Sequence, residues 1–320
     1  MIGHIGPTPV VLVTGAAGFI GSRTVPLLLD AGCEVVAVDD LSGETSWHIP
    51  TGPRITFVEQ DLRDPHGVSD LCTATDPDIV VHLAARHFIP YCEAHPTDTR
   101  AVNLGATRNL LVALGAQRPR RIVFASSAAV YSPTMAPIAE TGRLGPCELY
   151  GATKRAGERM LQRYAAASPG AGDLRIARLF NVVGPGDRNP HLLPEIIRQA
   201  RDGGHLTLGN VTSRRDYVYV DDVAFVLAHL ALAPLAPRVL NVGSGQARTV
   251  MEVVAEVEVA LGRRLTVSSS PQRTRAVDYP VLQADVRLLH ATVSGHSWTP
   301  FRTAVRDTIA SLVMAEGVPR

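Results

Sequence analysis

The stretch "VTGAAGFIGS", residues 13–22, places three glycines at intervals of three directly after a short apolar run. The run "VVLV" (10–13) predicts a buried strand, and the pattern from about Phe19 to Ala31 predicts a helix. Glycine permits a tight turn between the two and lets the backbone approach a pyrophosphate, whose charge then lies at the helix N-terminus. This context predicts a dinucleotide site formed by Gly15, Gly18, Phe19, Ile20 and Gly21.

Short β-branched runs alternate with helical patterns through the first half of the chain. Further strands are expected at 33–38, 55–58, 78–83 and 121–126, and helical stretches at 98–116 and 150–167. Several of the runs are apolar on both faces, which is typical of buried parallel strands. The fold class predicted is α/β: a Rossmann-type doubly wound parallel sheet with a smaller mixed α/β substrate-binding lobe.

The pattern changes after about residue 180, where segments such as "GPGDRNP" (184–190) alternate with short helices and strands. We therefore expect a dinucleotide-binding domain over 1–180, to which roughly 216–245 returns. The remainder of 181–320 is expected to form mainly the substrate-binding lobe.

Composition excludes several classes of protein. Lys and Arg (31) nearly balance Asp and Glu (30), so no basic field for nucleic acid or an anionic membrane is expected. No apolar stretch approaches the roughly 18 residues of a membrane span, and the N-terminal residues do not resemble a signal peptide. The cysteines share no metal-ligand spacing and no disulfide pattern, which predicts reduced thiols, no metal and a cytoplasmic location; they are Cys33, Cys72, Cys92 and Cys147.

Asp39 ends the second expected strand, about 18 residues after the last glycine of the loop. A carboxylate there accepts hydrogen bonds from the ribose hydroxyls of a dinucleotide but repels a 2′-phosphate. The neighbouring "VDDLSGET" contains no arginine to reverse that preference. The predicted cofactor is therefore NAD rather than NADP.

Tyr150 and Lys154 lie four residues apart in "ELYGATKRAGE" (148–158), on one face of an expected helix. A phenol with an ordinary pKa of about 10 is a poor base at neutral pH. A lysine ammonium beside it favours the phenolate, and the same lysine can hydrogen-bond the nicotinamide ribose. The strand end "FASSAAVYS" offers Ser126 and Ser127 as a third hydroxyl, and we select Ser127.

Together these motifs make the chain resemble an extended short-chain dehydrogenase/reductase, in the NDP-sugar epimerase/dehydratase family typified by UDP-glucose 4-epimerase. The resemblance covers nearly the whole chain in the family's order. It rests on "TGAAGFIGS" (14–22), "VDDLS" (38–42), "QDLRD" (60–64), "HLAA" (82–85), "SSAAVY" (126–131), "YGATK" (150–154), "RLFNVVGPG" (178–186) and "RRDYVYVDDVA" (214–224).

The resemblance implies further roles by position. Beside the glycine loop, Asp39, Tyr150 and Lys154, the cofactor would be contacted by Asp61 and Leu62 at the adenine, by Leu83, Ala84, Ala85 and Phe180 near the nicotinamide, and by Asn103 there or in the surrounding loop. The substrate would be contacted by His87, Ser127, Asn181, Leu193, Arg215, Arg275 and Asp278, with the arginines at the diphosphate. The resemblance also implies a homodimer.

The sequence departs from the family pattern at several positions. Family members that eliminate water resemble one another in an Asp–Glu pair directly after the serine or threonine, where this chain has Ala128 and Ala129. Epimerases often carry a lysine near the position of His87, and Cys147 and Glu148 replace the usual residues before the tyrosine.

The function expected is therefore NAD-dependent epimerisation of a nucleoside-diphosphate sugar, with a UDP-sugar favoured. Reaction would occur at C4 through a 4-keto intermediate with NAD retained. The alternative is a dehydratase or ketoreductase that uses the same Ser-Tyr-Lys residues on a nucleotide sugar or a related nucleoside. A third hypothesis, a non-catalytic dinucleotide sensor, has no need for a tyrosine placed as a base.

Overall fold

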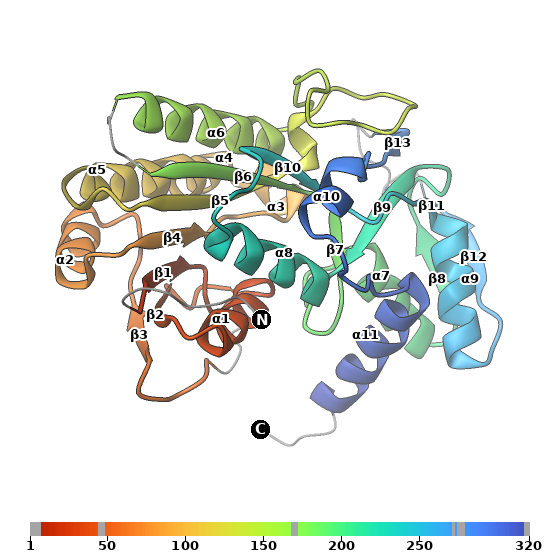
Figure 1. Cartoon of the computed structure of the whole chain (residues 1–320). Helices are drawn as coiled ribbons and strands as arrows, with labels where there is room; N and C mark the ends of the chain where they lie inside the picture. The colour runs from red at the N-terminus through yellow and green to blue at the C-terminus, as the bar shows by residue number, and fades with distance from the viewer. Residues whose placement is uncertain (1–7, 44–48, 168–171, 271–272, 274–278, 317–320) are drawn as a thin grey trace.

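The computed structural model describes residues 8–43, 49–167, 172–270, 273 and 279–316, which form a large helix-covered sheet and a smaller lobe (Figure 1). The large sheet contains β1 (Val10–Thr14), β2 (Glu34–Asp39), β3 (Ile55–Glu59), β4 (Ile79–His82), β5 (Arg121–Ser127), β6 (Asp173–Leu179) and β10 (Val239–Val242). Its flanking helices are α1 (Gly21–Asp30), α2 (Pro65–Thr75), α5 (Thr107–Gln117), α6 (Leu149–Ala167), α8 (Val220–Leu232) and α10 (Arg287–Thr292). Between them lie α3 (Ile89–Ala94), α4 (Pro96–Arg100), the π-helix η1 (Ala101–Ala106) and the 3₁₀ turn η2 (Ala128–Val130).

Within the described residues, the large sheet is entirely parallel, in the order β10-β6-β5-β4-β1-β2-β3. The chain moves outward from β1 to β3 and then restarts on the other side of β1 with β4. This reversal creates the crevice at the carboxyl ends of β1 and β4 where such sheets bind dinucleotides. The predicted fold class is confirmed, and the five strands predicted from the sequence are present within one or two residues of their expected bounds.

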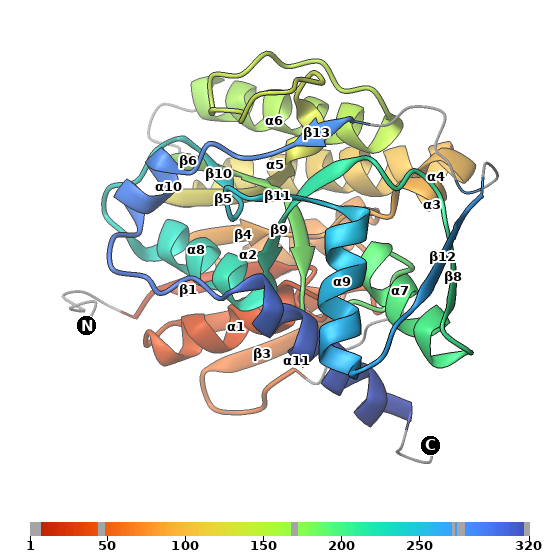
Figure 2. The ribbon, with the colours of Figure 1, turned by 90° about the vertical axis from the view of Figure 1, so that its right-hand side faces the viewer.

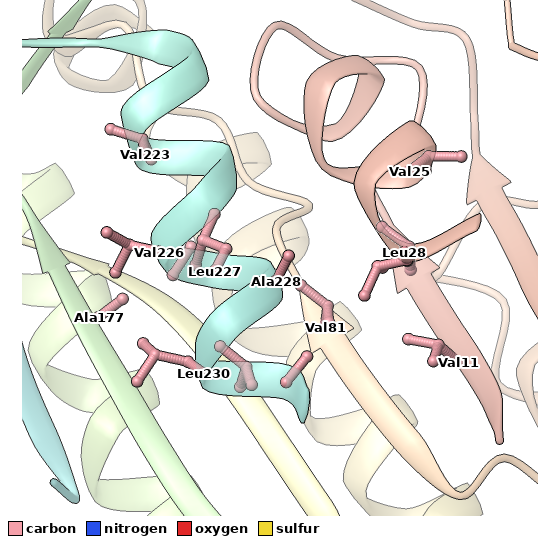
Figure 3. Packing of buried hydrophobic residues seen from close by; sticks show 14 of the residues in the cluster. Val11, Val25, Leu28, Val81, Ala177, Val223, Val226, Leu227, Ala228 and Leu230 are labelled. Carbon is pink, nitrogen blue, oxygen red and sulfur yellow. The ribbon is translucent and has the colours of Figure 1, made fainter. Parts of the chain in front are cut away.

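Both faces of the sheet are buried from β10 to β2, since helices pack on each side and alternate residues of a strand point to opposite faces. The edge strand β3 is partly exposed. Val11 and Val81 pack with α1 and α8 on one face, where Figure 3 shows Leu28 and Leu227 meeting the strands. Leu12 points the other way, into the core formed with α2, α5 and α6. The two apolar faces explain the almost unbroken Val/Ile/Leu runs of the sequence.

The smaller lobe lies beyond the carboxyl edge of the large sheet (Figure 2). Its four-stranded sheet contains β7 (Asn181–Val183), β9 (Arg214–Tyr219), β11 (Ala247–Thr249) and β13 (Val281–Leu282), and β8 (His205–Leu208) pairs with β12 (Thr266–Ser269). Helices α7 (Leu192–Arg201), α9 (Val250–Leu261) and α11 (Phe301–Glu316) enclose its own apolar core. Of the segment 216–245, α8 and β10 pack in the large sheet's layers, whereas most of β9 pairs within the smaller lobe.

A buried ion pair fixes helix α6 against the sheet. Arg178 of β6 donates from Nε and Nη2 to the two carboxylate oxygens of Glu158 on α6, both at 2.9 Å. The Ser126 hydroxyl of β5 donates to the same carboxylate at 2.7 Å. Arg178 also donates to Tyr131 Oη, which donates to Asn241 of β10. The Glu158 side chain has no exposed surface, so its charge is compensated entirely by these partners and Arg155.

This arrangement predicts that Glu158→Gln strongly destabilises the fold. Removing one partner of a buried ion pair leaves the other charge uncompensated, which typically costs about 3–5 kcal/mol. Urea unfolding of the variant measures the loss. Glu256→Gln is the matched control, since its partner Arg302 is 63% exposed and such pairs contribute little. Equal stability of the two variants would contradict the role given to Glu158.

Candidate active site

The predicted site residues converge on the carboxyl edge of the large sheet. Gly15 follows β1, Asp39 ends β2, Leu83 follows β4 and Ser127 ends β5. Tyr150 lies in the first turn of α6, which packs across β5. Elements separated by more than a hundred residues therefore supply one site.

The glycine loop is held in a conformation that side chains would prevent. Gly15 has φ +70°, and a Cβ there would lie 2.8 Å from the Ala84 backbone nitrogen. A Cβ on Gly21 would overlap the Gly15 carbonyl oxygen. Helix α1 starts here without a side-chain cap. The Ser22 and Arg23 amides already donate to the Gly18 and Ile20 carbonyls, so the amides that can face an anion lie before them. These features fit a dinucleotide pyrophosphate.

Asp39 lies beside this loop. Its carboxylate accepts hydrogen bonds from the amides of Ala17 and Leu41, both at 2.9 Å. Burial raises the pKa of Asp39, while these amide hydrogen bonds act to lower it. A carboxylate offers about four acceptor positions, so it retains capacity for ribose hydroxyls. The residue type and place fit the adenosine ribose of a dinucleotide.

The other residues predicted to contact the cofactor are spread around the same edge. Leu83, Ala84 and Ala85 form the partly buried loop after β4, and Leu62 and Phe180 are nearly buried. The Asp61 carboxylate makes a 2.8 Å ion pair with Arg63, and the Arg63 hydrogen bond lowers the pKa of Asp61.

The side chain of Asn103 makes hydrogen bonds to other protein groups. Its Oδ1 accepts from the Arg86 amide at 2.7 Å, and its Nδ2 donates to the Arg86 carbonyl and to Thr153 Oγ1. Thr153 in turn donates to the Tyr150 carbonyl. Asn103 lies in the π-helix η1, a local feature often found at functional sites. It thus ties the loop after β4 to the start of α6.

His82 is a buried neutral histidine within the same region. Thr107 donates its hydroxyl proton to the Asn103 carbonyl and can therefore only accept from His82 Nε2, at 2.9 Å. His82 Nδ1 must then accept from Thr14 Oγ1, at 2.7 Å. Burial lowers the pKa of His82 to about 3, so it carries no charge at neutral pH.

Tyr150 and Ser127 meet through their side chains. The phenol is partly buried, and Ser127 lies close enough to its hydroxyl to affect its ionisation. Burial raises the pKa of Tyr150, and the Ser127 hydrogen bond opposes that change. A base at this position therefore needs further stabilisation of its charged form.

Lys154 is placed to supply that stabilisation. It is 4% exposed, its Nζ lies 5.9 Å from the Tyr150 ring centroid, and it donates to the Ala125 carbonyl at 2.8 Å. An ammonium has three donors, so others remain for a ligand. Burial lowers the pKa of Lys154 to about 8. Lys154 is also the only lysine in the 320-residue sequence.

The start of α6 is fixed by contacts that place Tyr150. Glu93 of α3 accepts a hydrogen bond from the Leu149 amide at 2.8 Å and so caps the helix. Gly151 lies against the η2 turn, where a Cβ would overlap the Ala129 carbonyl oxygen. A glycine directly after Tyr150 therefore permits the backbone contact between the helix and the serine-bearing turn.

The residues predicted to contact substrate are distributed over the two lobes. Asn181 is exposed at the start of β7, Leu193 is 1% exposed in the smaller lobe's core, and Arg215 of β9 donates to the Tyr279 carbonyl at 2.6 Å. Arg275 and Asp278 lie outside the described residues.

His87 joins the two lobes near the site. It lies within electrostatic reach of Lys154, and its ring centroid is 5.5 Å from that of His191. His191 Nδ1 pairs with the buried Asp187 carboxylate at 2.8 Å, and Asn189 approaches His87 Nε2 at 3.4 Å. The sequence analysis gave no role to His191 or Asp187. Their contact joins the loop after β4 to the loop that precedes α7.

Sequence reasoning also missed Glu158 and Tyr279, which contact the catalytic elements rather than the crevice. Glu158 could have been suspected because it follows Lys154 by four residues on the same helix face. Tyr279 had no local signal. In the described part of the chain, no cluster of three or more ligating side chains could hold a metal, and no helix is long and apolar enough to cross a membrane.

Comparisons with known proteins show which family the chain belongs to. The model of the NAD-dependent epimerase/dehydratase family matches residues 11–243. The UDP-glucose 4-epimerase of Neisseria meningitidis serogroup A is 32% identical over 326 residues, covering 93% of this chain and 95% of that protein. A UDP-glucose 4-epimerase from Thermus thermophilus, solved with NAD, has 31% identity and a TM-score of 0.83, covering 96% and 99% of the two chains.

A similar structure of a different activity is the NAD-dependent NDP-hexosamine 5,6-dehydratase TunA. It is 28% identical with a TM-score of 0.83, covering 95% of this chain and 97% of its own. The chain belongs to the NAD-dependent epimerase/dehydratase family. The predictions that it is an enzyme and that its cofactor is NAD are thereby confirmed.

Because the chain has one lysine, the environment of Lys154 can be measured without interference. Lysine labelled with ¹³C at Cε should give one side-chain NMR signal that titrates at about pH 8, against about 10.4 for an exposed lysine. Burial disfavours the ammonium, so the midpoint is lowered. A midpoint near the ordinary value would contradict the buried position of Lys154.

Gly151→Ala should impair turnover by displacing Tyr150 from Ser127. A misplacement of about 1 Å can lower turnover by about 10²-fold. Gly115→Ala on α5 is the control, because a Cβ there meets nothing within 4 Å. That change should leave turnover intact and raise stability by about 0.4–1 kcal/mol. Similar turnover of the two variants would show that the contact with η2 is not needed.

Proposed function

We propose that the protein epimerises a nucleoside-diphosphate sugar at C4, through a 4-keto intermediate and with retained NAD. A UDP-sugar is the favoured substrate. Several similar proteins carry the name UDP-glucose 4-epimerase, and one similar structure is described as a complex with UDP-glucose and NAD. The choice of epimerisation rests on one observation: two buried alanines, Ala128 and Ala129, directly follow Ser127.

The proposed steps follow from the positions of three side chains. Tyr150 takes the proton of the C4 hydroxyl and later returns it. Lys154 stabilises the phenolate during that transfer, since its Nζ lies 5.9 Å from the centroid of the Tyr150 ring. Ser127 lies beside the phenol, where its hydroxyl favours the phenolate and can contact the reacting hydroxyl. The chemistry that bound NAD would supply at this site is the reversible acceptance of a hydride from C4.

The residues proposed to hold the cofactor are those of the glycine loop and the strand ends around it. Gly15, Gly18 and Gly21 would admit the pyrophosphate, and the amides at the start of α1 would face its charge. Asp39 would accept the adenosine ribose hydroxyls and exclude a 2′-phosphate. Asn103 would act by fixing the adjoining loop, because its side chain is bonded within the protein.

For the substrate, we propose that Arg215 and Asn181 contact the diphosphate from the smaller lobe, with Arg275 and Asp278 from the segment before Tyr279. His87 would face the same crevice from the dinucleotide-binding side. Leu193 would act indirectly, by shaping the core beneath the nucleobase pocket. A homodimer, implied by the family resemblance, remains part of the proposal.

The dehydratase alternative has one specific observation in its favour, the structural similarity to TunA. Eliminating water needs a base for the C5 proton and an acid for the leaving hydroxyl. Ala128 and Ala129 supply neither through their side chains, and both are closely packed, at 1% and 7% exposed.

The test is a panel of UDP-, GDP-, CDP- and dTDP-sugars incubated with the purified protein without added NADH. We expect an isomeric product of unchanged mass, identified by NMR and mass spectrometry. Tyr150→Phe should lower turnover by about 10²–10⁴-fold, the usual contribution of a general base. A product lighter by one water, or a need for added NADH, would overturn the epimerase proposal. Nearly unchanged turnover of Tyr150→Phe would overturn the role of the phenol.

A further inference from the structure

Tyr279 connects the substrate lobe to the turn that carries the catalytic serine. It lies two residues before β13, is 6% exposed and packs among Tyr131, Phe180 and Leu282. Its single hydroxyl proton is shared between the carbonyl oxygens of Ala129 and Tyr131, which lie 3.1 and 3.0 Å from Oη. These acceptors are the residues on either side of Val130 in and after η2.

The η2 turn is therefore held from two sides. Helix α6 contacts the Ala129 carbonyl at Gly151, and Tyr279 donates to the same carbonyl from the other lobe. The amide of Ala129 donates to Ser127 Oγ at 3.2 Å. Any shift of the turn thus changes the position of the Ser127 hydroxyl.

Tyr279 is itself fixed at its backbone. Its carbonyl accepts a hydrogen bond from Arg215 Nη1 at 2.6 Å. A continuous series of contacts therefore runs from Arg215 through Tyr279 and Ala129 to Ser127, and from Ser127 to Tyr150. Its ends are the arginine proposed at the diphosphate and the proposed base.

We propose that Tyr279 is a positioning residue for catalysis: its hydroxyl holds the η2 turn so that Ser127 meets the Tyr150 phenol. The inference rests on the proposed function, in which Tyr150 transfers the proton. Tyr279 acts through the turn and makes no contact with the reacting atoms. Its ring packs in the apolar cluster independently of the hydroxyl, so Tyr279→Phe removes the shared hydrogen bond to the two carbonyls and retains the packing.

The change should also alter how turnover depends on pH. The Ser127 hydrogen bond lowers the pKa of Tyr150, so a displaced serine raises it and moves the rise of kcat to higher pH. The other ionisable groups that act on the phenol are Lys154 on α6, Cys92 on α3 and Glu148 before α6. Tyr279→Phe removes none of them.

The experiment compares Tyr279→Phe with Tyr164→Phe. Tyr164 donates its hydroxyl to the Leu114 carbonyl at 3.0 Å, toward the far end of α6 from the site, so the control loses the same kind of bond elsewhere. Tyr279→Phe should lower kcat by about 10- to 100-fold with KM nearly unchanged. Its kcat–pH curve should move to higher pH, and the Ala129 amide should exchange with solvent at least about tenfold faster by NMR. Tyr164→Phe should show none of these changes.

The inference would be overturned by the same kcat and pH curve for both variants, by faster exchange at Ala129 without loss of kcat, or by a loss confined to KM. Failure of the proposed function is separately visible, because the parent protein would then epimerise no sugar of the panel. Amide exchange needs no substrate. Unchanged exchange at Ala129 would then still refute the role given to Tyr279.

Discussion

The burial of the Glu158 carboxylate against Arg178 is the interaction on which the site depends. Glu158 follows Lys154 by one helical turn and Tyr150 by two, so fixing its position fixes both. A shift of α6 along the sheet would leave a buried carboxylate and a buried guanidinium without partners, at a cost of several kcal/mol. The ion pair thus selects one position of the helix. Apolar packing alone, which tolerates small displacements more readily, would specify that position less sharply.

Close backbone contacts set the remaining positions. Gly15, Gly21 and Gly151 each occupy a place where a Cβ would meet another backbone segment, and Gly157 lies against the Phe124 ring. Two of these contacts shape the glycine loop, and the other two seat α6 on β5 and η2. The cofactor side and the catalytic side of the crevice are therefore built in the same way, by bringing main chains closer than side chains allow. Ion pairs and glycines together fix the relative positions of these elements, which a purely apolar interface would leave free to shift.

The sequence predicted what depends on local pattern. The strands around β1, the glycine loop, Asp39 and the Tyr150–Lys154 spacing could all be recognised from neighbouring residues. Strand β6 could not, because "DLRIARL" places two arginines in what proves to be a central buried strand. The charge of Arg175 is balanced there by Asp173. Its guanidinium also donates to the carbonyls of Leu230 and Ala233 near the end of α8, 55 and 58 residues away. Tyr279 was equally hidden, since its acceptors lie about 150 residues earlier in the chain. Contacts of that span leave no periodicity to detect.

The electrostatics of Tyr150 and Lys154 explain why these two residues depend on their neighbours. Burial raises the pKa of the Tyr150 phenol and lowers that of the Lys154 ammonium, so it disfavours the charged form of each group alone. A phenolate and an ammonium formed close together compensate one another, and the Ser127 hydrogen bond favours the phenolate further. The charged state is therefore accessible only when serine, tyrosine and lysine are all in place. In the proposed mechanism, that requirement makes the position of the η2 turn, and of the helix that faces it, a determinant of proton transfer. The fold meets it with contacts drawn from both lobes, which is why residues remote from the crevice belong to the account of its chemistry.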